Sequence, residues 1–569
     1  MTTTVLRPIE GSFHLIGIGG AGMSVVAELL KERGATVSGS DRSDSDALTR
    51  LKSRGISCFV GHDAANVPED ATIVVSTAIR ETNPELVIGR KRGQRIIHRS
   101  RALALAASGM RFLAVAGAHG KTTTSGMLAV ALRAAGLDPS VAVGGIVPQF
   151  GSGAHLGTGD VFVAEADESD ASFLNYRPNI EIVTNVEPDH LDRYGTPEAF
   201  EEVFLDFARQ LDVGGVLIVC AEDPGAARLA SAALELGIRV LTYGRPETSL
   251  IPADIEISEL ELSARSGSAI FASSAGIVRV AVNVPGVHNI LNAAAAWAAG
   301  VLLGIEPQVM ASSLEAFTGT ARRFEARGEV DGRRVFDDYA HHPTEVAASI
   351  AEARIVAGDA PVVVVFQPHL FSRTRIFAER FAQALSGADR VVVTEIYAAR
   401  EDPEPGVTAE LISSKIEGAS YVPDMHEAAR LAARECGEKG IVLTMGAGSI
   451  TDCADDVLEE WSIMAGQGGR LPPPGVLVPL RGGVILNDTP LLLGRGIRIR
   501  RPKGMLLLRR ALKGASLEHI PAKSVTSQRS PGQSVLPERS SSKRVMSEHS
   551  PADWAALEHS SVKTESRRQ

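Results

Sequence analysis

The segment from Ala116 to Thr124, AGAHGKTTT, constrains this chain more than any other feature. It follows the apolar run Phe112 to Ala116 and precedes a helix-like stretch, so it predicts a strand, a glycine turn and a helix start. Glycines let backbone N–H groups approach phosphate oxygens, the helix N-terminus attracts anions, and a lysine at this place reaches the terminal phosphates. The segment therefore predicts a binding site for a nucleoside triphosphate.

The spacing of this loop separates it from the commonest phosphate-binding loops. Those loops carry a glycine five positions before their Gly-Lys pair, where this chain has Val115. Its turn instead runs from Gly117 through Gly120 and Lys121 to Thr122, so it fits ordinary GTPases and transport ATPases poorly. A glycine turn with a solvated lysine is the alternative, and the run of threonines after Lys121 disfavours it.

A second glycine-rich turn lies near the start of the chain. Gly17 to Gly22 reads GIGGAG directly after the predicted strand Phe13 to Ile16, and Asp41 follows about 20 residues later, as in dinucleotide-binding folds. The glycines serve a tight turn and the close approach of a diphosphate, so the motif indicates a diphosphate more strongly than a nicotinamide. Packing of a helix on a strand without any ligand stays open as an alternative.

Polar residues follow two further predicted strands, Val161 to Ala164 and Ile180 to Thr184. The segments are EADESD (165–170) and NVEPDHLD (185–192). Ligands of open parallel sheets bind beyond the carboxyl ends of the strands, where these groups would meet the phosphates. Carboxylate, imidazole and hydroxyl groups at that place predict a Mg²⁺ site. Helix capping by Asp167 or Ser169 is the structural alternative.

The alternation of predicted strands and helices divides the chain into four parts. Residues 1–107, 108–321 and 322–465 each alternate strands with helices, which predicts three consecutive α/β domains. The first and third are expected to be Rossmann-like, and the second carries the P-loop. Residues 466–569 contain a Leu-Pro-Pro-Pro break and become rich in Ser, Pro, Arg and Lys, which predicts a basic, largely disordered extension.

Composition and charge exclude several classes of protein. The chain is 44% hydrophobic and 22% charged, as in soluble globular proteins, and no run reaches the roughly 18 apolar residues of a membrane span. The start lacks the apolar stretch of a signal peptide, so a cytoplasmic location is expected. Residues 470–569 carry a net charge of +11, which leaves −21 for residues 1–469 and argues against nucleic acid as a partner of the globular part. The four cysteines show no zinc-site spacing: Cys58, Cys220, Cys436 and Cys453.

Eight motifs follow one another in an order that resembles the Mur ligases of peptidoglycan synthesis. They are AGAHGKTTT, EADESD, TNVEPDHLDRYG, GVHNILNAAAA (286–296), ARRFE (321–325), DDYAHHPTEV (337–346), FQPHLFSRT (366–374) and GAGSI (446–450). Within the family the resemblance is greatest to the members that add L-alanine, whose opening GIGGAGMS is matched by residues 17–24.

The resemblance implies an ATP-dependent amide ligase of cell wall biogenesis. In this reaction the γ-phosphate of ATP activates the lactyl carboxylate of UDP-N-acetylmuramate, the amine of L-alanine attacks the acyl phosphate, and ADP and phosphate leave. A carboxylate is a poor electrophile, so the protein mainly positions groups and neutralises charge. The resemblance also implies Mg²⁺, a monomer or weak homodimer, and three domains that bind the UDP-sugar, ATP and the amino acid in chain order.

Motif positions assign these functions to individual residues. The UDP part of the substrate would meet the first glycine turn and its surroundings: Gly17, Gly19, Gly20, Gly22, Met23, Ser24 and Asp41. ATP would meet the P-loop, two asparagines against adenine, an arginine near the triphosphate and an aspartate near the ribose: Gly117, His119, Gly120, Lys121, Thr122, Thr123, Asn289, Asn292, Arg323 and Asp338. Mg²⁺ would be held by Thr122, Glu165 and His190, and alanine by Tyr339, His341 and Arg373.

Four of these residues are the candidate catalytic groups. Lys121 would hold the β- and γ-phosphates, and His190 would reach the metal site that bridges phosphate and carboxylate. Arg373 would pair with the carboxylate of the amino acid, and His341 is a candidate acceptor for the amine proton.

Three features distinguish this chain within the resemblance. The chain has no lysine between Lys121 and Lys415, so the carbamylated lysine of several later-acting Mur ligases cannot form here. Ala118 stands where threonine is common, which removes a hydroxyl but no backbone donor. Leu370 occupies a position where some relatives carry a second arginine, which leaves Arg373 as the carboxylate anchor and bears on alanine affinity.

Three other functions remain as alternatives. A related ligase that attaches a preformed peptide to UDP-N-acetylmuramate would share these motifs and differ in its amino substrate. An NAD-dependent oxidoreductase would use the first glycine turn and Asp41. A non-enzymatic P-loop switch would leave His341 and Arg373 without a role.

Overall fold

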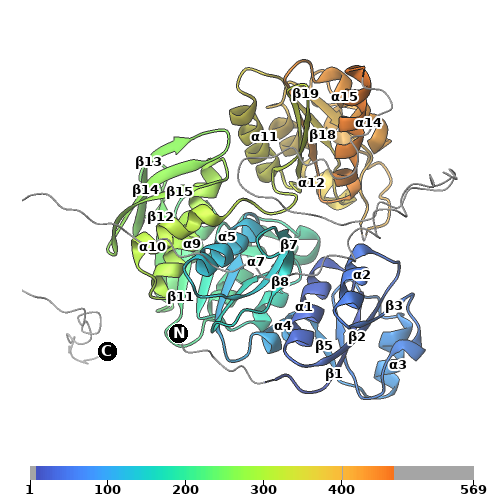
Figure 1. The fold of residues 1–569 in the computed structure, drawn as a ribbon, viewed down its shortest axis with the longest axis vertical. Coiled ribbons are helices and arrows are strands. Elements are labelled where there is room, and N and C mark those ends of the chain that lie inside the picture. Colours follow the sequence, from blue (N-terminus) through green and yellow to red (C-terminus); the bar gives the residue numbers. More distant parts are fainter. Residues whose placement is uncertain (1–7, 400, 467–569) are drawn as a thin grey trace, which may run out of the picture. The chain divides into compact units, whose positions relative to one another are not determined.

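The computed structural model describes residues 8–399 and 401–466, and these residues form three α/β domains in chain order (Figure 1). Each domain contains its own sheet, which confirms the expected fold class. The sheets occupy residues 12–98, 111–282 and 325–445, and the boundaries at 107/108 and 321/322 stay predictions. The extension predicted at 466–569 lies outside the described residues, apart from Gly466. Within the described residues, no helix combines the length and the apolar character needed to span a membrane.

The first domain has five parallel strands in the order β3-β2-β1-β4-β5. The order reverses between β1 and β4, and the first glycine turn follows β1 at this switch point, where open α/β sheets bind ligands. Its elements are β1 (Ser12–Ile16), α1 (Ala21–Glu32), β2 (Thr36–Asp41), α2 (Asp46–Ser53), β3 (Ser57–Val60), β4 (Thr72–Val75), α3 (Pro84–Lys91), β5 (Ile96–His98) and α4 (Arg99–Ala106).

The central domain has a ten-stranded sheet in the order β15-β14-β13-β12-β11-β10-β6-β9-β7-β8. The strands from β13 to β7 in this order pair in parallel, and β8, β14 and β15 add antiparallel edges. The strands are β6 (Arg111–Ala116), β7 (Ser140–Val147), β8 (Ser152–His155), β9 (Val161–Glu165), β10 (Ile180–Val183), β11 (Val216–Cys220), β12 (Arg239–Gly244), β13 (Ile255–Leu262), β14 (Gly267–Ser273) and β15 (Gly276–Val282).

Helices cover both faces of the central sheet. They are α5 (Lys121–Ala134), α6 (Leu191–Tyr194), α7 (Pro197–Ala208), α8 (Pro224–Glu235), α9 (Val287–Leu302) and α10 (Pro307–Ser313). Helix α5 packs directly against α9, where the small side chains of residues 293–296 are fully buried. Small side chains let two helix backbones approach closely. The start of α9 is thereby placed beside the start of α5, where the phosphate-binding loop ends.

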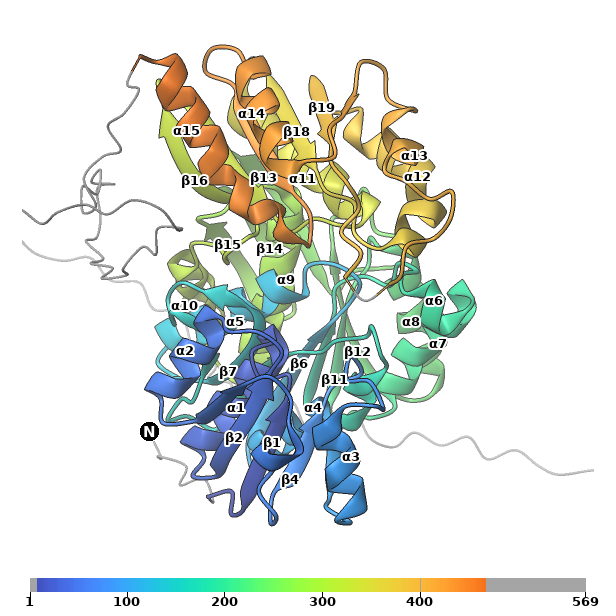
Figure 2. The same cartoon turned by 90° about the vertical axis from the view of Figure 1, so that its right-hand side faces the viewer.

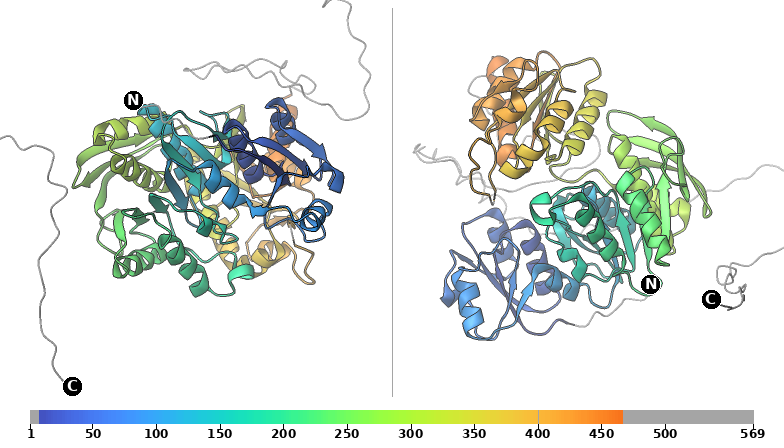
Figure 3. Two further views of the ribbon diagram at one scale, coloured as in Figure 1. Left: turned by 90° about the horizontal axis from the view of Figure 1, so that it is seen from below. Right: turned by 180° about the vertical axis from the view of Figure 1, so that it is seen from behind.

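The meander β13-β14-β15 was not predicted from the sequence. It continues the parallel sheet at one edge (Figure 3). Ile257, Phe271 and Val280 are buried, while Glu256 and Ile277 are exposed, so one face of the meander is covered and the other meets water. Alternation of this kind is typical of antiparallel sheets with one packed face.

The third domain has six strands in the order β16-β17-β21-β18-β19-β20, and only the β16–β17 pair is antiparallel. In Figure 2, α14 and α15 lie side by side on one face. Alternate valines of β18 face two separate apolar clusters, as the period of a strand requires. Its elements are β16 (Glu325–Val330), β17 (Arg333–Asp338), α11 (Pro343–Ala357), β18 (Val362–Phe366), α12 (Phe371–Leu385), β19 (Arg390–Val393), α13 (Glu410–Ser413), β20 (Ser420–Tyr421), α14 (Met425–Glu435), β21 (Ile441–Met445) and α15 (Ala454–Met464).

One carboxyl group lies inside the central sheet without a partner. Glu181 in β10 is fully buried, and neither of its carboxyl oxygens has a hydrogen-bond partner among the described residues. Burial raises the pKa of Glu181 well above its ordinary value, because the charged form loses its hydration. Folding therefore favours the neutral form of this carboxyl.

Replacing this carboxyl should stabilise the protein. We expect Glu181→Met to raise the free energy of unfolding by about 1–3 kcal/mol, because it removes a buried polar group that lacks a partner. The gain should be larger at about pH 8 than at about pH 5. The pKa of this carboxyl is raised in the folded state, so the unfolded state loses the proton first and wild-type stability falls as the pH rises above about 4.5. Urea unfolding of both proteins at the two pH values measures this. The exposed Glu235→Met is the control, and equal gains from both variants would contradict the argument.

Candidate active site

The phosphate-binding loop joins β6 to α5 at the carboxyl edge of the central sheet. Gly117 has φ +132° and Gly120 has φ +80°, conformations that side chains disfavour. A Cβ atom at Gly117 would clash with Thr184 Oγ1, and one at Gly120 would lie 3.0 Å from Asn292 Oδ1. The loop is therefore fitted closely between the end of β10 and the start of α9, and both glycines are required.

The residues that follow β10 hold this loop in place. Thr184 Oγ1 donates to the carbonyl of His119 at 2.5 Å, and Asn185 Nδ2 donates to the same carbonyl at 3.0 Å. Asn185 Oδ1 accepts from the backbone N–H of His119 at 2.9 Å. Both backbone groups of His119 are thus occupied, which leaves the other N–H groups of the turn for a ligand.

Lys121 is the first residue of α5, and its ammonium group is turned back onto the loop. Nζ donates to the carbonyls of Gly117 at 2.6 Å and Ala118 at 3.1 Å, and lies 2.9 Å from the carboxylate of Glu168. Burial raises the pKa of Glu168 to about 7, although Lys121 opposes the rise. A triphosphate in the loop would compete with Glu168 for this ammonium.

Thr122, in the first turn of α5, lies beside Glu165, the last residue of β9. Thr122 Oγ1 donates to Glu165 Oε2 at 3.1 Å, and the same oxygen accepts from the N–H of Gly144 at 2.9 Å. A hydroxyl and a carboxylate are hard oxygen donors that suit Mg²⁺. His190 Nε2 lies 3.9 Å from Glu168, and its buried Nδ1 has no hydrogen-bond partner among the described residues. This orphaned nitrogen fits a ligand-binding role better than a structural one.

Helix α9 carries both predicted adenine contacts in its first turns. Asn289 Nδ2 donates to the carbonyl of Pro285 at 2.6 Å, and Asn292 Nδ2 lies 3.4 Å from Asn289 Oδ1. Both side chains are buried, and Asn292 lies against Gly120 as described above. The two asparagines and the P-loop are therefore neighbours, although they are far apart in the sequence.

The segment between the second and third domains brings Arg323 to the same region. Arg323 Nη1 pairs with Glu345 at 3.2 Å, and its guanidinium lies 5.2 Å from the ring centre of Tyr339. Asp338, at the end of β17, accepts two backbone N–H groups at 2.7 and 2.8 Å. Burial nevertheless raises the pKa of Asp338 to about 6.

His341 and Arg373 differ in their freedom to meet a substrate. His341 Nδ1 donates to the carbonyl of Tyr339 at 2.9 Å, so Nε2 is the nitrogen that can accept a proton. Burial lowers the pKa of His341 to about 4, which keeps its ring neutral at pH 7. Arg373, on α12, binds both oxygens of Asp189 at 2.9 and 3.0 Å. An amino-acid carboxylate at Arg373 would therefore have to compete with Asp189.

Glu187 was missed by the sequence analysis as an individual residue. Its carboxylate accepts from His119 Nε2 at 3.1 Å, from Thr344 Oγ1 at 2.6 Å and from Arg380 Nη2. His119 belongs to the P-loop, whereas Thr344 lies in the first turn of α11 and Arg380 lies in α12. One carboxylate thus connects the phosphate-binding loop with two helices of the third domain. Its place in the NVEPDHLD segment was the available signal, but its partners are 68 to 193 residues away.

The first glycine turn is closed by a side chain of its own domain. Asp41 Oδ2 accepts from the N–H of Gly19 at 2.9 Å, and a Cβ at Gly19 would lie 2.9 Å from the same oxygen. Met23 packs into the core, and Ser24 Oγ donates to the carbonyl of Ala21 at 3.0 Å. The side chains of Met23 and Ser24 are therefore occupied within α1 and its core, and the backbone N–H of Ser24 donates to the carbonyl of Gly20 at 2.8 Å.

Arg99 is a second residue that sequence reasoning did not identify. Its guanidinium lies against Gly22, where a Cβ would come within 2.6 Å of Nη1, and pairs with Asp167 at 2.9 Å. Asp167 belongs to the EADESD segment that follows β9. Arg99 thus contacts both the first glycine turn and the acidic segment of the central domain.

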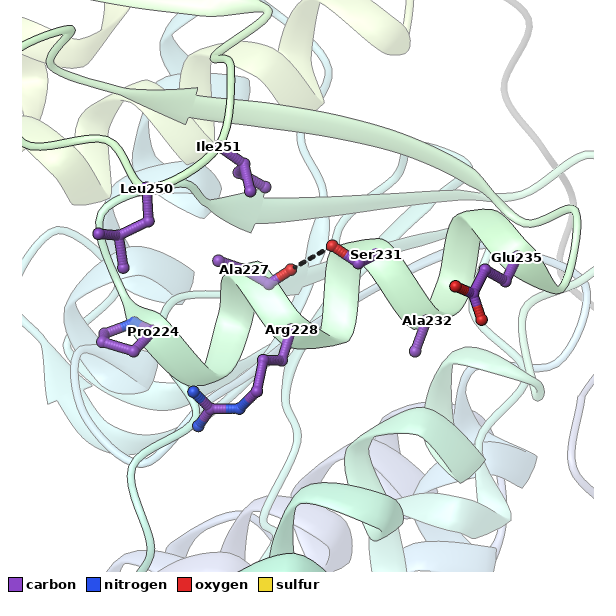
Figure 4. A pocket seen from close by; sticks show the side chains of 8 residues that line it. All are labelled: Pro224, Ala227, Arg228, Ser231, Ala232, Glu235, Leu250 and Ile251. Carbon is purple, nitrogen blue, oxygen red and sulfur yellow. Dashed lines mark hydrogen bonds between the residues drawn. The ribbon is translucent and has the colours of Figure 1, made fainter.

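A groove of about 470 Å³ lies elsewhere, along α8 (Figure 4). Its lining is Pro224, Ala227, Arg228, Ser231, Ala232, Glu235, Leu250 and Ile251. None of the predicted site residues lines it, and its one arginine already pairs with Glu201 at 2.6 Å. A smaller cavity lies at the predicted alanine site, between Asp189 and His190 on one side and Leu370, Arg373 and Phe377 on the other. Of the predicted site residues, His190 and Arg373 line this cavity.

Comparison with known proteins agrees with this arrangement. Three family models match the chain in order: "Mur ligase family, catalytic domain" over 12–111, "Mur ligase middle domain" over 115–300 and "Mur ligase, glutamate ligase domain" over 322–448. The UDP-N-acetylmuramate–L-alanine ligases of Renibacterium salmoninarum and Kineococcus radiotolerans are each 50% identical to it, over 79% of this chain and 96% of each relative.

The chain belongs to the Mur ligase family.

Solved structures support the same assignment. The structure of UDP-N-acetylmuramate-alanine ligase MurC from Thermotoga maritima has a TM-score of 0.67 and 29% identity, and covers 80% of this Mur ligase and 100% of that chain. A murein peptide ligase from Psychrobacter arcticus has a TM-score of 0.61 at 24% identity, over 79% of this chain and 98% of its own, and shares the fold. The family resemblance deduced from the eight motifs is thereby confirmed.

The contacts of His119 in this Mur ligase make a measurable prediction. Burial disfavours its charged form, but Glu187 at 3.1 Å and Glu345 at 3.6 Å raise its pKa to about 9. We expect Glu187→Gln to lower the pKa of His119 by about one unit or more, because the variant removes a carboxylate that stabilises the imidazolium. NMR titration of ring-labelled histidine measures this. Glu198→Gln, a change at an exposed acid of α7, is the control, and an unchanged His119 pKa in Glu187→Gln would contradict the assignment.

Proposed function

We propose that this Mur ligase joins L-alanine to the lactyl carboxylate of UDP-N-acetylmuramate, with conversion of ATP to ADP and phosphate, in the synthesis of peptidoglycan precursors. The observation that carries this proposal is identity of 50% with alanine-adding relatives over nearly their whole length. The P-loop geometry supports the use of ATP. Residues 1–107 would hold the UDP-sugar, 108–321 the ATP, and 322–465 the amino acid.

The loop at Gly117 and Gly120 would bind the triphosphate through its free N–H groups. Lys121 would leave Glu168 and move to the β- and γ-phosphates, where its charge offsets the charge that develops during phosphoryl transfer. Thr122 and Glu165 would hold Mg²⁺, with His190 beside them. When bound, Mg²⁺ would neutralise phosphate charge and orient the γ-phosphoryl group.

The third domain would supply the groups around the amino acid. Arg373 would orient the alanine carboxylate, and Tyr339 would line the site. His341 would take the amine proton at Nε2 as the amide forms, since its Nδ1–H is held by the carbonyl of Tyr339. A low pKa makes His341 a weak base in this structure, and the charge of bound phosphates would raise that pKa. The enzyme would work in the cytoplasm as a monomer or weak homodimer.

The reaction can be tested by omission of single substrates. We expect phosphate release from purified protein only when ATP, Mg²⁺, UDP-N-acetylmuramate and L-alanine are all present, because the acyl phosphate forms on the sugar acid and is consumed by the amine. A coupled phosphate assay with each component left out in turn measures this. Phosphate release that ignores the sugar or the amino acid would refute the proposal. A tripeptide offered in place of alanine distinguishes this enzyme from peptide-adding ligases. Turnover with the tripeptide but not with alanine would assign the enzyme to the peptide-adding ligases.

Lys121 should be needed for turnover but not for binding of the UDP-sugar. We expect Lys121→Ala to lower kcat by about 10³-fold or more, because one charged contact to the transferring phosphate is lost. Calorimetry should give nearly the same UDP-N-acetylmuramate affinity as the wild type, since that ligand is assigned to the first domain. Lys415→Ala, which removes an exposed lysine paired with Glu379, is the matched control. Equal loss of turnover and UDP-sugar binding in Lys121→Ala would contradict the division of sites.

A further inference from the structure

A cluster of three potential metal ligands lies in the third domain, outside the proposed active site. His426 is in the first turn of α14, Cys453 ends the short helical turn Ser449–Cys453, and Asp456 is in the first turn of α15. One ligand atom from each lies within 4.8 Å of the others. Neither the family motifs nor the proposed mechanism uses these side chains.

The distances within the cluster are close to those of a coordination site. His426 Nδ1 lies 2.7 Å from Asp456 Oδ2 and 3.9 Å from Cys453 Sγ. In a tetrahedral zinc site, bond lengths of about 2.0–2.3 Å place neighbouring ligand atoms about 3.3–3.6 Å apart. A shift of the His426 ring by about 1 Å, away from Asp456 and towards Cys453, would bring both distances close to this range.

We propose that His426, Cys453 and Asp456 form a binding site for a thiophilic divalent cation of the zinc class, with a fourth position open to water. Cation binding would release the thiol proton of Cys453 to solvent, and the proton on His426 Nδ1 would be replaced by one on its exposed Nε2. Mg²⁺ is not the expected ion, because thiolate and imidazole are poor ligands for it.

The surroundings of the cluster favour such an ion. Arg430 Nη1 binds Asp456 Oδ1 at 3.0 Å, which fixes the carboxylate while leaving Oδ2 directed at His426, as outer hydrogen bonds do in metal sites. Asp424 accepts the N–H of His426 at 2.9 Å and fixes the start of α14. Asp424 and Asp452 add negative potential near Cys453, which offsets the charge of Arg430.

The site would fasten α14 to the turn that precedes α15. That turn is bonded to the nucleotide side of the domain, since Thr451 Oγ1 donates to Asp337 Oδ2 at 2.7 Å, next to the proposed ribose contact Asp338. A bound cation would therefore stabilise the third domain without contacting the substrates. Its expected signature is a rise in Tm, because binding to the folded state shifts unfolding by mass action.

Cobalt(II) is a suitable probe, because its thiolate complexes absorb light and identify the sulfur ligand. We expect full-length protein, treated with chelator and free of nucleotide, to bind one Co²⁺ with a thiolate-to-metal absorption band that Zn²⁺ removes and excess Mg²⁺ does not. Cys453→Ser should lose the band, and Cys58→Ser, which changes a half-buried thiol far from the cluster in the sequence, should keep it. Absence of the band in the wild type, its survival in Cys453→Ser or its removal by Mg²⁺ would overturn the proposal.

A second variant guards against a Cys453→Ser protein that fails to fold. The side chain of His426 is 45% exposed, so His426→Gln should keep the native circular dichroism spectrum. We expect it to bind Zn²⁺ at least about tenfold more weakly in competition with a chromophoric chelator, and to lose the zinc-dependent rise in Tm. Wild-type zinc affinity in a folded His426→Gln protein would also overturn the proposal.

Discussion

The close fit of the P-loop between β10 and α9 is the constraint on which the rest of the active site depends. Gly117 and Gly120 must lack side chains because Thr184 and Asn292 occupy that space. The fit in turn requires α9 to approach α5 closely, which its run of alanines allows. The proposed phosphate-binding loop, the proposed adenine contacts and the packing of α5 on α9 therefore belong to one packing arrangement, and a larger side chain at any of these contacts would affect all three.

Charged side chains connect the central and third domains. Glu187 and Asp189 belong to one short segment, and each binds a different arginine of α12, Arg380 and Arg373. The Arg373–Asp189 pair is almost fully buried, so loss of one partner would leave a buried charge without its counter-charge, which is more costly than loss of the pair. Since His190 follows Asp189 directly, the docking of the third domain and the position of the proposed metal-side imidazole are linked.

The sequence predicted those structural features that are determined by residues close together in the chain. Apolar runs such as Phe112 to Ala116 gave strands, and the glycine turn after that run gave the P-loop, because the chemistry and the geometry lie within ten residues. The meander β13–β15 was missed because its alternating pattern is interrupted, with a register shift between Ser258 and Glu261. The contacts of Glu187 with Thr344 and Arg380, and of Arg99 with Asp167, could not be predicted, because these partners come from other domains and only the folded chain brings them together.

The surroundings of Arg373 bear on which amine this enzyme accepts. The cavity beside it is small, and Leu370, Ile376 and Phe377 give it apolar walls. Asp189 already neutralises Arg373, so an incoming carboxylate brings a second anion to one guanidinium and gains less than at a free arginine. Because Leu370 stands where some relatives carry a second arginine, it adds no further positive charge for the incoming carboxylate. The apolar walls would then contribute more than charge to holding the methyl group of the proposed alanine substrate.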